Sequence, residues 1–260
     1  MPLYRNKDRA ILLVHIPKTG GSSLEEMLVD AGALQALKFH KRLGFSASTP
    51  QHMQWDVLRR WVPKEFYNFS FTVVREPYAR LASEYAWRQT ISQNPVLPFN
   101  DWVRDIFGRY EKNPYILDNH IRPQVDFIGP KVRVFKLEDG LDPAAKMAFR
   151  RLGLTYRKPK TPHVRKSEHK VIEIERSTLA IVRDFYAADF EQLDYDPLVL
   201  PEHLFTLVDD PIPEVVAEPQ APVTAPEPLI APPPLRPPAW RVLGSQVKQR
   251  LKTVARKLGG

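Results

Sequence analysis

The sequence predicts an α/β fold in which a central parallel β-sheet is covered by helices on both faces. Three apolar segments have the length and composition of buried strands, and segments with helical spacing lie between and after them. Strands that alternate with helices along a chain are typical of a parallel sheet, because each parallel connection needs a crossover. The chain of 260 residues is long enough for one such domain and an appendage.

Each of the three strands is predicted from a short apolar run. Residues 10–15 are apolar and partly β-branched, which is typical of a buried strand. The second strand lies in NFSFTVVREP, residues 68–77, and is expected to end at Arg75 because Pro77 cannot continue a ladder. The third lies in KVRVFKLED, residues 131–139, where apolar and polar residues alternate.

The helices are predicted from apolar spacing and from residues that start or stop helices. Ser22 or Ser23 is expected near the N-cap of the first helix, with Glu25 in its first turn. Pro143 and Gly153 mark the two ends of another helix. The expected helical segments are 22–33, 51–61, 78–89, 99–110, 142–153 and 177–192.

Composition limits the classes of function. The formal net charge of +8 favours anionic ligands. The chain has no cysteine, which excludes disulfides, thiolate metal sites and cysteine nucleophiles. No signal peptide and no apolar stretch of roughly 20 residues is recognisable, so we expect a cytoplasmic protein. The sequence gives no indication of the oligomeric state.

The chain divides into three parts by composition. Residues 1–200 are expected to form the globular domain, and residues 201–239 are rich in proline and predict a disordered linker. Residues 240–260 predict a basic amphipathic helical tail. Basic amphipathic helices bind anionic membrane surfaces, so we expect peripheral contact with the inner face of the membrane through 240–258. The alternative is docking on the chain's own core or on a partner protein.

The segment PKTGGSS follows the first strand and has the residue types of an anion-binding loop. Glycines allow the backbone to approach a ligand closely, and the first N–H groups of a helix bind oxyanions. Lys18 adds a full positive charge. The lysine precedes the glycines, unlike the order in a nucleoside triphosphate loop. The alternative is a simple glycine turn with a solvated lysine.

A second cationic segment, VVREPYARLASEY, follows the second strand. Arg75 stands at the carboxyl end of that strand and can bind a phosphate through two hydrogen bonds. A triphosphate-hydrolysing enzyme would be expected to have an acid there to hold magnesium. The alternative is that Arg75 pairs with Glu76 or Glu84 on a solvated surface.

These two segments together resemble the sulfotransferases that use 3′-phosphoadenosine 5′-phosphosulfate (PAPS). The similarity is greater to the carbohydrate branch that includes heparan sulfate 2-O-sulfotransferases and bacterial relatives. HIPKTGGSS is similar to the family's 5′-phosphosulfate loop, and VREPYARLASEY to its 3′-phosphate motif. The resemblance covers residues 10–195 and implies a P-loop NTPase-like three-layer fold with a central parallel sheet.

The resemblance implies a set of donor-binding residues. Those expected to hold the 5′-phosphosulfate are Lys18, Thr19, Gly20, Gly21, Ser22 and Ser23. Those expected to bind the 3′-phosphate are Arg75 and Ser83, and those expected in a late loop over the nucleotide are Lys166 and Ser167. Glu76 departs from the asparagine that relatives often carry, so it must point away from the phosphate or pair with a base.

Transfer to a hydroxyl requires a group that accepts the hydroxyl proton. The resemblance assigns this role of general base to His52, and Lys18 stabilises the departing phosphate. His120 is the alternative base or, with Arg122 and Gln124, part of an acceptor site. The histidines show no metal-ligand spacing, so no metal is predicted. Further candidates for sugar binding are Trp87, Arg88 and Trp102.

The sequence therefore predicts a PAPS-dependent sulfotransferase that acts on a hydroxyl of a carbohydrate or glycolipid, without nucleic acid as a partner. Two alternatives remain. A P-loop-type nucleotide kinase would bind ATP and require magnesium, and a non-catalytic nucleotide- or polyanion-binding adaptor would bind without turnover.

Overall fold

The computed structural model describes residues 2–38, 44, 46–157 and 171–211. The chain separates into two compact units, Met1–Pro211 and Ile212–Gly260, and every described residue belongs to the first. The expected linker beyond Pro211, the basic tail and the late-loop residues Lys166 and Ser167 lie outside the described residues.

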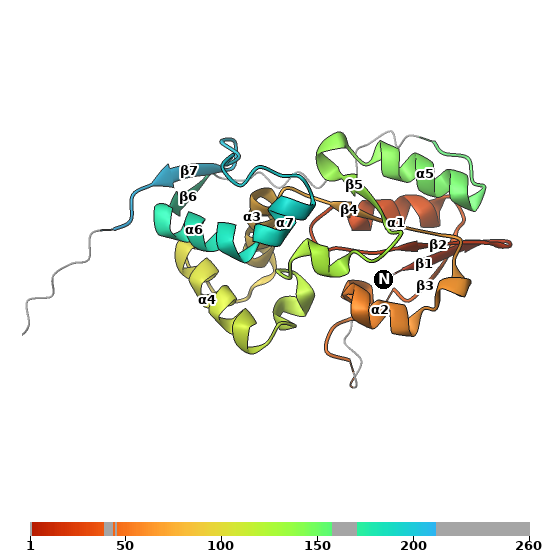
Figure 1. The fold of residues 1–260 in the computed structure, drawn as a ribbon, viewed down its shortest axis with the longest axis horizontal. Helices are drawn as coiled ribbons and strands as arrows, with labels where there is room; N and C mark the ends of the chain where they lie inside the picture. Colours follow the sequence, from red (N-terminus) through yellow and green to blue (C-terminus); the bar gives the residue numbers. More distant parts are fainter. Residues whose placement is uncertain (1, 39–43, 45, 158–170, 212–260) are drawn as a thin grey trace, which may run out of the picture. The chain divides into compact units, whose positions relative to one another are not determined.

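Five strands form the central sheet (Figure 1). In spatial order they are β3 (Leu34–Ala36), β1 (Leu3–Asn6), β2 (Arg9–Leu13), β4 (Phe69–Val74) and β5 (Arg133–Lys136). The three predicted strands are β2, β4 and β5, and they pair in parallel, as expected. The expectation of a wholly parallel sheet is wrong, because β1 pairs antiparallel with both β2 and β3. The sheet is therefore mixed.

Strand β1 was not predicted, because it depends on the tight turn that follows it rather than on its residue composition. Residues 3–9 are mostly polar, so they show little strand signal. Lys7 adopts a left-handed backbone with φ of 55° in the tight connection from β1 to β2. Tyr4 of β1 is fully buried and pairs with Ile11, so a single aromatic residue anchors this strand in the core.

Helices cover both faces of the sheet, as predicted. Ile11 and Leu13 of β2 point to one face and pack in a core with α1 (Gly21–Asp30) and α5 (Asp142–Leu152). Leu12, between them in sequence, points to the opposite face and packs with α2 (Trp55–Trp61). Because neighbouring residues of a strand point to opposite faces, β2 contributes to both cores and is buried throughout its apolar run.

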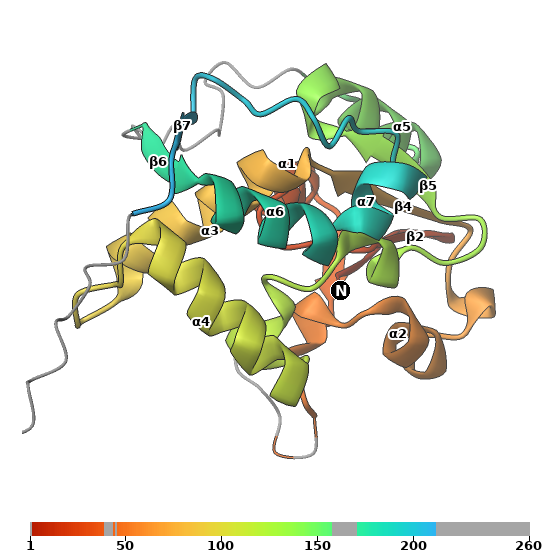
Figure 2. The ribbon, with the colours of Figure 1, turned by 60° about the vertical axis from the view of Figure 1, so that its left-hand side comes forward.

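A second group of elements packs beside the sheet around its own apolar core (Figure 2). Aromatic residues such as Phe107 and Tyr186 fill this core. The elements are α3 (Pro77–Ile91), α4 (Phe99–Lys112), β6 (Ile172–Glu175), α6 (Arg176–Phe185), α7 (Ala187–Gln192) and β7 (Phe205–Val208). The two strands β6 and β7 form a separate parallel sheet.

Two expectations about this region are corrected. The predicted helix 177–192 is broken at Tyr186, whose side chain is fully buried and whose hydroxyl donates to the Ile121 carbonyl. The domain does not end at residue 200, because Phe205 is buried and β7 pairs with β6. The compact unit continues to Pro211.

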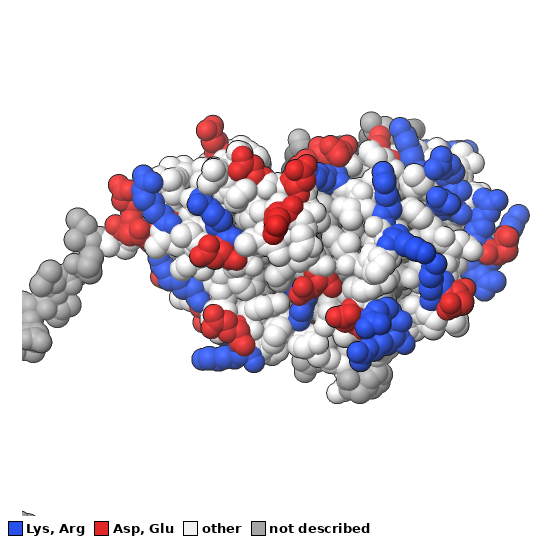
Figure 3. Space-filling view, in the orientation of Figure 1, with Lys and Arg blue, Asp and Glu red and all other residues white. Residues whose placement is uncertain are grey.

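The surface of the described unit mixes both signs of charge (Figure 3). Lysine and arginine side chains gather over the half that contains α5 and the central sheet, and acids interleave with bases over α4 and α6. Within the described residues, none of the helices has the length and apolar character needed to span a membrane.

Candidate active site

The loop between β2 and α1 has an unusual backbone that begins at the carboxyl end of the strand. Lys18 and Gly20 both adopt left-handed conformations, with φ of 68° and 84°. Thr19 is buried, and its hydroxyl donates to the carbonyl of Ile16 at 2.9 Å. The Thr19 side chain therefore folds the loop, and Gly20 replaces the expected serine as the residue that precedes α1.

Packing at the first turn of α1 requires a glycine at position 21. A Cβ atom at this position would lie 2.9 Å from three atoms of the His15 ring. The imidazole of His15 therefore packs directly against the start of the helix. Ser22 is exposed and Ser23 half-buried in the same turn. These residues place a hydroxyl-rich helix start beside Lys18, an arrangement that binds oxyanions.

Glu25 lies beyond the first turn of α1, in which it was expected, and its carboxylate is turned inward and fully buried. It accepts a hydrogen bond from Nδ1 of His15 and another from the amide of Gln51 at 3.2 Å. Lys38 lies 3.4 Å away. Burial would raise the pKa of Glu25, but the bond from His15 and the nearby charges hold the pKa at about 2. Glu25 thus fixes the His15 ring against the loop.

Arg75 lies at the carboxyl end of β4 and meets the loop that follows β2. Its Nη1 atom is 3.4 Å from the carbonyl oxygen of Lys18. Its backbone N–H donates to Oε1 of Gln124 at 2.9 Å, and its carbonyl accepts from Nε2 of the same amide at 2.7 Å. The two cationic segments therefore meet at one edge of the sheet, and Gln124 holds the second of them in register.

Glu76 is bound at the start of α3, close enough to Arg75 for the two charges to interact. Its two carboxylate oxygens accept hydrogen bonds from the backbone N–H groups of Tyr78 and Ala79, so it caps α3. Burial raises the pKa of Glu76 to about 7, against these bonds. The position that departs from the family pattern thus acts as a helix cap.

Arg80 is a buried arginine that joins the loop to the histidine region. Its Nε atom donates to the Pro17 carbonyl at 3.1 Å, and Nη2 donates to the His120 carbonyl at 2.7 Å. The side chain is only 2% exposed. Both bonds are to neutral carbonyl groups, so Arg80 positions the backbone of the site.

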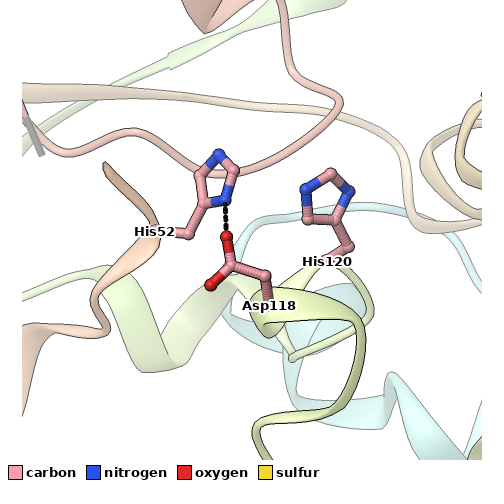
Figure 4. A group of neighbouring side chains, drawn as sticks. All are labelled: His52, Asp118 and His120. Carbon is pink, nitrogen blue, oxygen red and sulfur yellow. Dashed lines mark hydrogen bonds and ion pairs between the residues drawn. The ribbon is translucent and has the colours of Figure 1, made fainter. Parts of the chain in front are cut away.

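His52 lies in a 3₁₀ turn, Pro50–His52, and forms a hydrogen-bonded pair with Asp118 (Figure 4). Nδ1 of His52 is 2.7 Å from Oδ2 of Asp118. The carboxylate also accepts from the backbone N–H and the hydroxyl of Thr49, each at 2.6 Å. A carboxylate on Nδ1 favours the tautomer whose Nε2 is unprotonated, which is the form that a general base requires.

His52 is uncharged at neutral pH in this environment. Burial lowers its pKa to about 3, with a further contribution from His120 and His15, whereas the bond to Asp118 acts in the opposite direction. The ring of His52 lies 5.2 Å from that of His15 and 4.8 Å from that of His120, measured between centroids. A negative charge bound beside these rings would raise the pKa of His52 and strengthen it as a base.

His120 belongs to a second histidine–carboxylate pair. Its Nδ1 atom is 2.7 Å from Glu84, whose carboxylate also binds Arg88 at 2.6 Å. Burial would raise the pKa of Glu84, but His120 and Arg88 hold the pKa at about 2. In Figure 4 the His120 ring stands edge-on to His52. Glu84 is therefore paired with His120 and Arg88 rather than with Arg75.

The trio His52, Asp118 and His120 has donor atoms close enough to hold a metal ion, within 4.8 Å of one another. The ligand atoms of Asp118 and His120 are, however, already engaged in hydrogen bonds. The Asp118 carboxylate already accepts three hydrogen bonds, one of them from His52. Nδ1 of His120 faces Glu84. These contacts fix the orientation of both imidazole rings.

The other predicted residues lie at different depths. Ser83 is half-buried on α3. Arg122 is 8% exposed and donates to Asn119, Asp126 and the Pro114 carbonyl. Trp102 cannot form an exposed sugar platform, because it is buried among the aromatic residues of the second core. Trp87 is half-buried, and the Nζ atom of Lys18 lies 5.0 Å from its ring centroid.

Sequence reasoning missed the three carboxylates that orient the histidines: Glu25, Glu84 and Asp118. Each is distant in sequence from at least one of its partners, as Asp118 is from His52, so no local spacing predicts the pair. The available signal for Asp118 was its place two residues before His120 in a segment without other acids. Three consecutive residues there, Leu117, Asp118 and Asn119, have positive φ, which composition does not predict.

Comparison with known proteins identifies a family for most of the chain. The family model described as the sulfotransferase family matches residues 2–196, which is most of the chain. No curated protein and no solved structure gives a significant match. Proteins of this family are transferases of the sulfuryl group and generally use PAPS as the donor. The chain belongs to the sulfotransferase family.

Proposed function

We propose that this chain transfers a sulfuryl group from PAPS to a hydroxyl of a carbohydrate or glycolipid, with His52 as the general base and without a metal ion. The observation that supports it most strongly is the meeting of two anion-binding segments, marked by the 3.4 Å contact between Arg75 and the Lys18 carbonyl, beside the His52–Asp118 pair. The fold we infer for this site is the P-loop-like arrangement of the carbohydrate branch.

The residues present fit such a donor. Gly20 turns the chain into α1 with a left-handed backbone, and the first N–H groups of that helix are donors that a phosphosulfate can bind. Lys18 is positioned to neutralise one end of the donor, and Arg75 the 3′-phosphate at the other. The donor supplies an activated sulfuryl group and a phosphate as leaving group.

The chain's own side chains would manage the proton and the charge. His52, kept neutral by burial, accepts the hydroxyl proton at Nε2, and Asp118 stabilises the resulting imidazolium. Lys18 stabilises negative charge on the departing phosphate. Arg80 and Gln124 keep the loop, the strand end and His120 at fixed separations.

Calorimetry with 3′,5′-adenosine bisphosphate and with ATP, each with and without magnesium, tests the donor assignment. We expect binding of the bisphosphate in EDTA, weakened at least about tenfold by Arg75→Ala, because a charged hydrogen bond contributes about 1.5–3 kcal/mol. Preference for ATP with magnesium would support the kinase alternative instead.

A radiolabelled sulfate-transfer assay over a panel of glycans and glycolipids then separates an enzyme from an adaptor. We expect transfer that His52→Ala abolishes while bisphosphate binding is kept. Binding of the bisphosphate without transfer to any acceptor, and indifference to His52→Ala, would indicate the adaptor. The contact of residues 240–258 with the inner face of a membrane stays a separate proposal, testable by sedimentation with anionic vesicles.

A further inference from the structure

Residues 189–195, the end of α7 and the turn after it, contact the surroundings of Arg75, although the two regions lie far apart in the sequence. In Figure 2, α7 lies beside β4 and β5. The first residue of this segment, Asp189, is fully buried, and the charge of the buried Arg80 acts on it. A buried carboxylate needs hydrogen-bond donors, so its partners show which part of the structure it holds in place.

Asp189 supports Arg75 through Gln124. Its two carboxylate oxygens accept from the backbone N–H groups of Gln124 and Val125, at 2.8 and 3.0 Å, at the start of the 3₁₀ turn Gln124–Phe127. The Gln124 side chain in turn binds the backbone N–H and the carbonyl of Arg75. Asp189 and Gln124 are both fully buried, so loss of one partner would leave buried polar groups without a hydrogen bond.

Tyr195 supports the neighbouring residue, Glu76, through Glu138. The Tyr195 hydroxyl donates to Oε2 of Glu138 at 2.9 Å, and Oε1 of the same carboxylate accepts from the Glu76 N–H at 2.8 Å. Lys136, at the end of β5, lies against the tyrosine ring, with Nζ 4.3 Å from its centroid. The negative charge of Glu138 acts on Arg75, and the two hydrogen bonds of this carboxylate fix where that charge lies.

Both paths end at the carboxyl end of β4, where the 3′-phosphate is expected to bind. A guanidinium binds a phosphate through two parallel N–H groups, so its orientation matters as much as its charge. Nη1 of Arg75 is 3.4 Å from the carbonyl oxygen of Lys18. A shift of the backbone at Arg75 would move its guanidinium relative to Lys18, and one donor molecule could no longer contact both side chains well.

We propose that Asp189 is a positioning residue for the 3′-phosphate site, and that Tyr195 is its second support. Asp189 acts on Arg75 through Gln124, and Tyr195 acts through Glu138. The segment 189–195 thus sets the guanidinium for the 3′-phosphate of the donor. This inference rests on the proposed function, since it concerns the affinity of the same site for its donor.

The contribution of the 3′-phosphate alone tests this role. Calorimetry on the full chain compares 3′,5′-adenosine bisphosphate with adenosine 5′-monophosphate, and the ratio of the two affinities measures what the 3′-phosphate adds. We expect Asp189→Asn to lower this ratio at least about fivefold and to leave monophosphate binding within about twofold of wild type. The asparagine keeps the size of the side chain, but its –NH₂ group cannot accept from a backbone N–H. In an Arg75→Ala background, Asp189→Asn should cause no further loss.

Tyr195→Phe provides a second test, because it removes only a hydroxyl and keeps the ring beside Lys136. It should lower the same ratio by about threefold. Tyr85→Phe is the matched control, because the Tyr85 hydroxyl donates to the Leu97 carbonyl in the second core. This control should leave the ratio unchanged.

The proposal is overturned if Asp189→Asn leaves the ratio unchanged, or if it lowers the ratio equally in the Arg75→Ala background. Equal weakening of both ligands also overturns it, because the effect would then pass through Arg80, which binds the loop at the Pro17 carbonyl. If Asp189→Asn does not fold, Tyr195→Phe decides by the same criteria. A wild-type chain that does not bind the bisphosphate would refute the proposed function itself, whereas tight binding with an unchanged ratio in the variants refutes only the positioning role.

Discussion

Replacing Asp118 by asparagine tests the role of the histidine–carboxylate pair in depth. The substitution keeps the size of the side chain and an oxygen that can accept from the Thr49 N–H. The amide –NH₂ group, however, cannot accept the proton on Nδ1 of His52, 2.7 Å away. The imidazole must then turn or adopt the opposite tautomer, with the proton on Nε2, where it cannot act as a base.

The expected loss follows from this change of tautomer. The same substitution in a serine-protease triad lowers kcat about 10⁴-fold, so we expect a fall of about 10³- to 10⁴-fold in sulfuryl transfer for Asp118→Asn. At about 1.4 kcal/mol per tenfold change, this is roughly 4–5.5 kcal/mol of activation free energy. Binding of 3′,5′-adenosine bisphosphate should stay within about threefold of wild type, because the carboxylate does not contact the loop or Arg75.

Two assays together check this prediction. Sulfate transfer from labelled PAPS gives the rate, and ¹⁵N chemical shifts of the His52 ring report which nitrogen holds the proton. A wild-type ring protonated on Nδ1 and a mutant ring protonated on Nε2 are expected. An Asp118→Asn protein that keeps activity within tenfold of wild type, or whose His52 ring is unchanged, would refute the reasoning.

Three further predictions concern stability and support of the site. In the unfolded chain His52 binds a proton below about pH 6.5, whereas the folded side chain binds one only near pH 3. Acidification therefore favours unfolding, by about 2 kcal/mol at pH 5. His52→Gln should flatten this pH dependence of the free energy of unfolding, measured in urea titrations between about pH 7 and 5. Gly21→Ala should destabilise the chain by about 1–3 kcal/mol and weaken bisphosphate binding, because its Cβ meets the His15 imidazole at 2.9 Å. Gly108→Ala, which has open space around it, should stabilise the chain by about 0.5–1 kcal/mol. Equal effects of the two substitutions on stability would contradict the packing at Gly21. Gln124→Ala removes the hydrogen-bond partner of both the N–H and the carbonyl of Arg75. It should destabilise the chain by about 1–3 kcal/mol per group and weaken bisphosphate binding measured by calorimetry. Unchanged affinity would show that Gln124 does not position the arginine.

The parallel part of the sheet could be predicted from sequence because burial imposes long apolar runs. The strands at residues 9–13 and 69–74 are such runs, whereas the strand at 133–136 was predicted from alternating apolar and polar residues. The helix ended by Gly153 has the expected left-handed residue, with φ of 67°. Strands β1, β3, β6 and β7 were missed because each is only three or four residues long and carries polar or charged residues. Their pairing depends on partners elsewhere in the chain.

The candidate site was predictable where its chemistry is local. The glycine loop and Arg75 each stand at a strand end, and that position alone suggests an anion. The orientation of the histidines depends on contacts across many residues, such as the pair of His52 with Asp118, and on a strained backbone. No periodicity in the sequence encodes these contacts.

The central claim is that the two cationic segments bind opposite ends of one adenosine donor. A crystal structure of the chain with 3′,5′-adenosine bisphosphate, grown in EDTA, tests it most directly. The claim predicts the 5′-phosphate at the start of α1 beside Lys18 and the 3′-phosphate on the guanidinium of Arg75. A bisphosphate that leaves either position without a phosphate would contradict it.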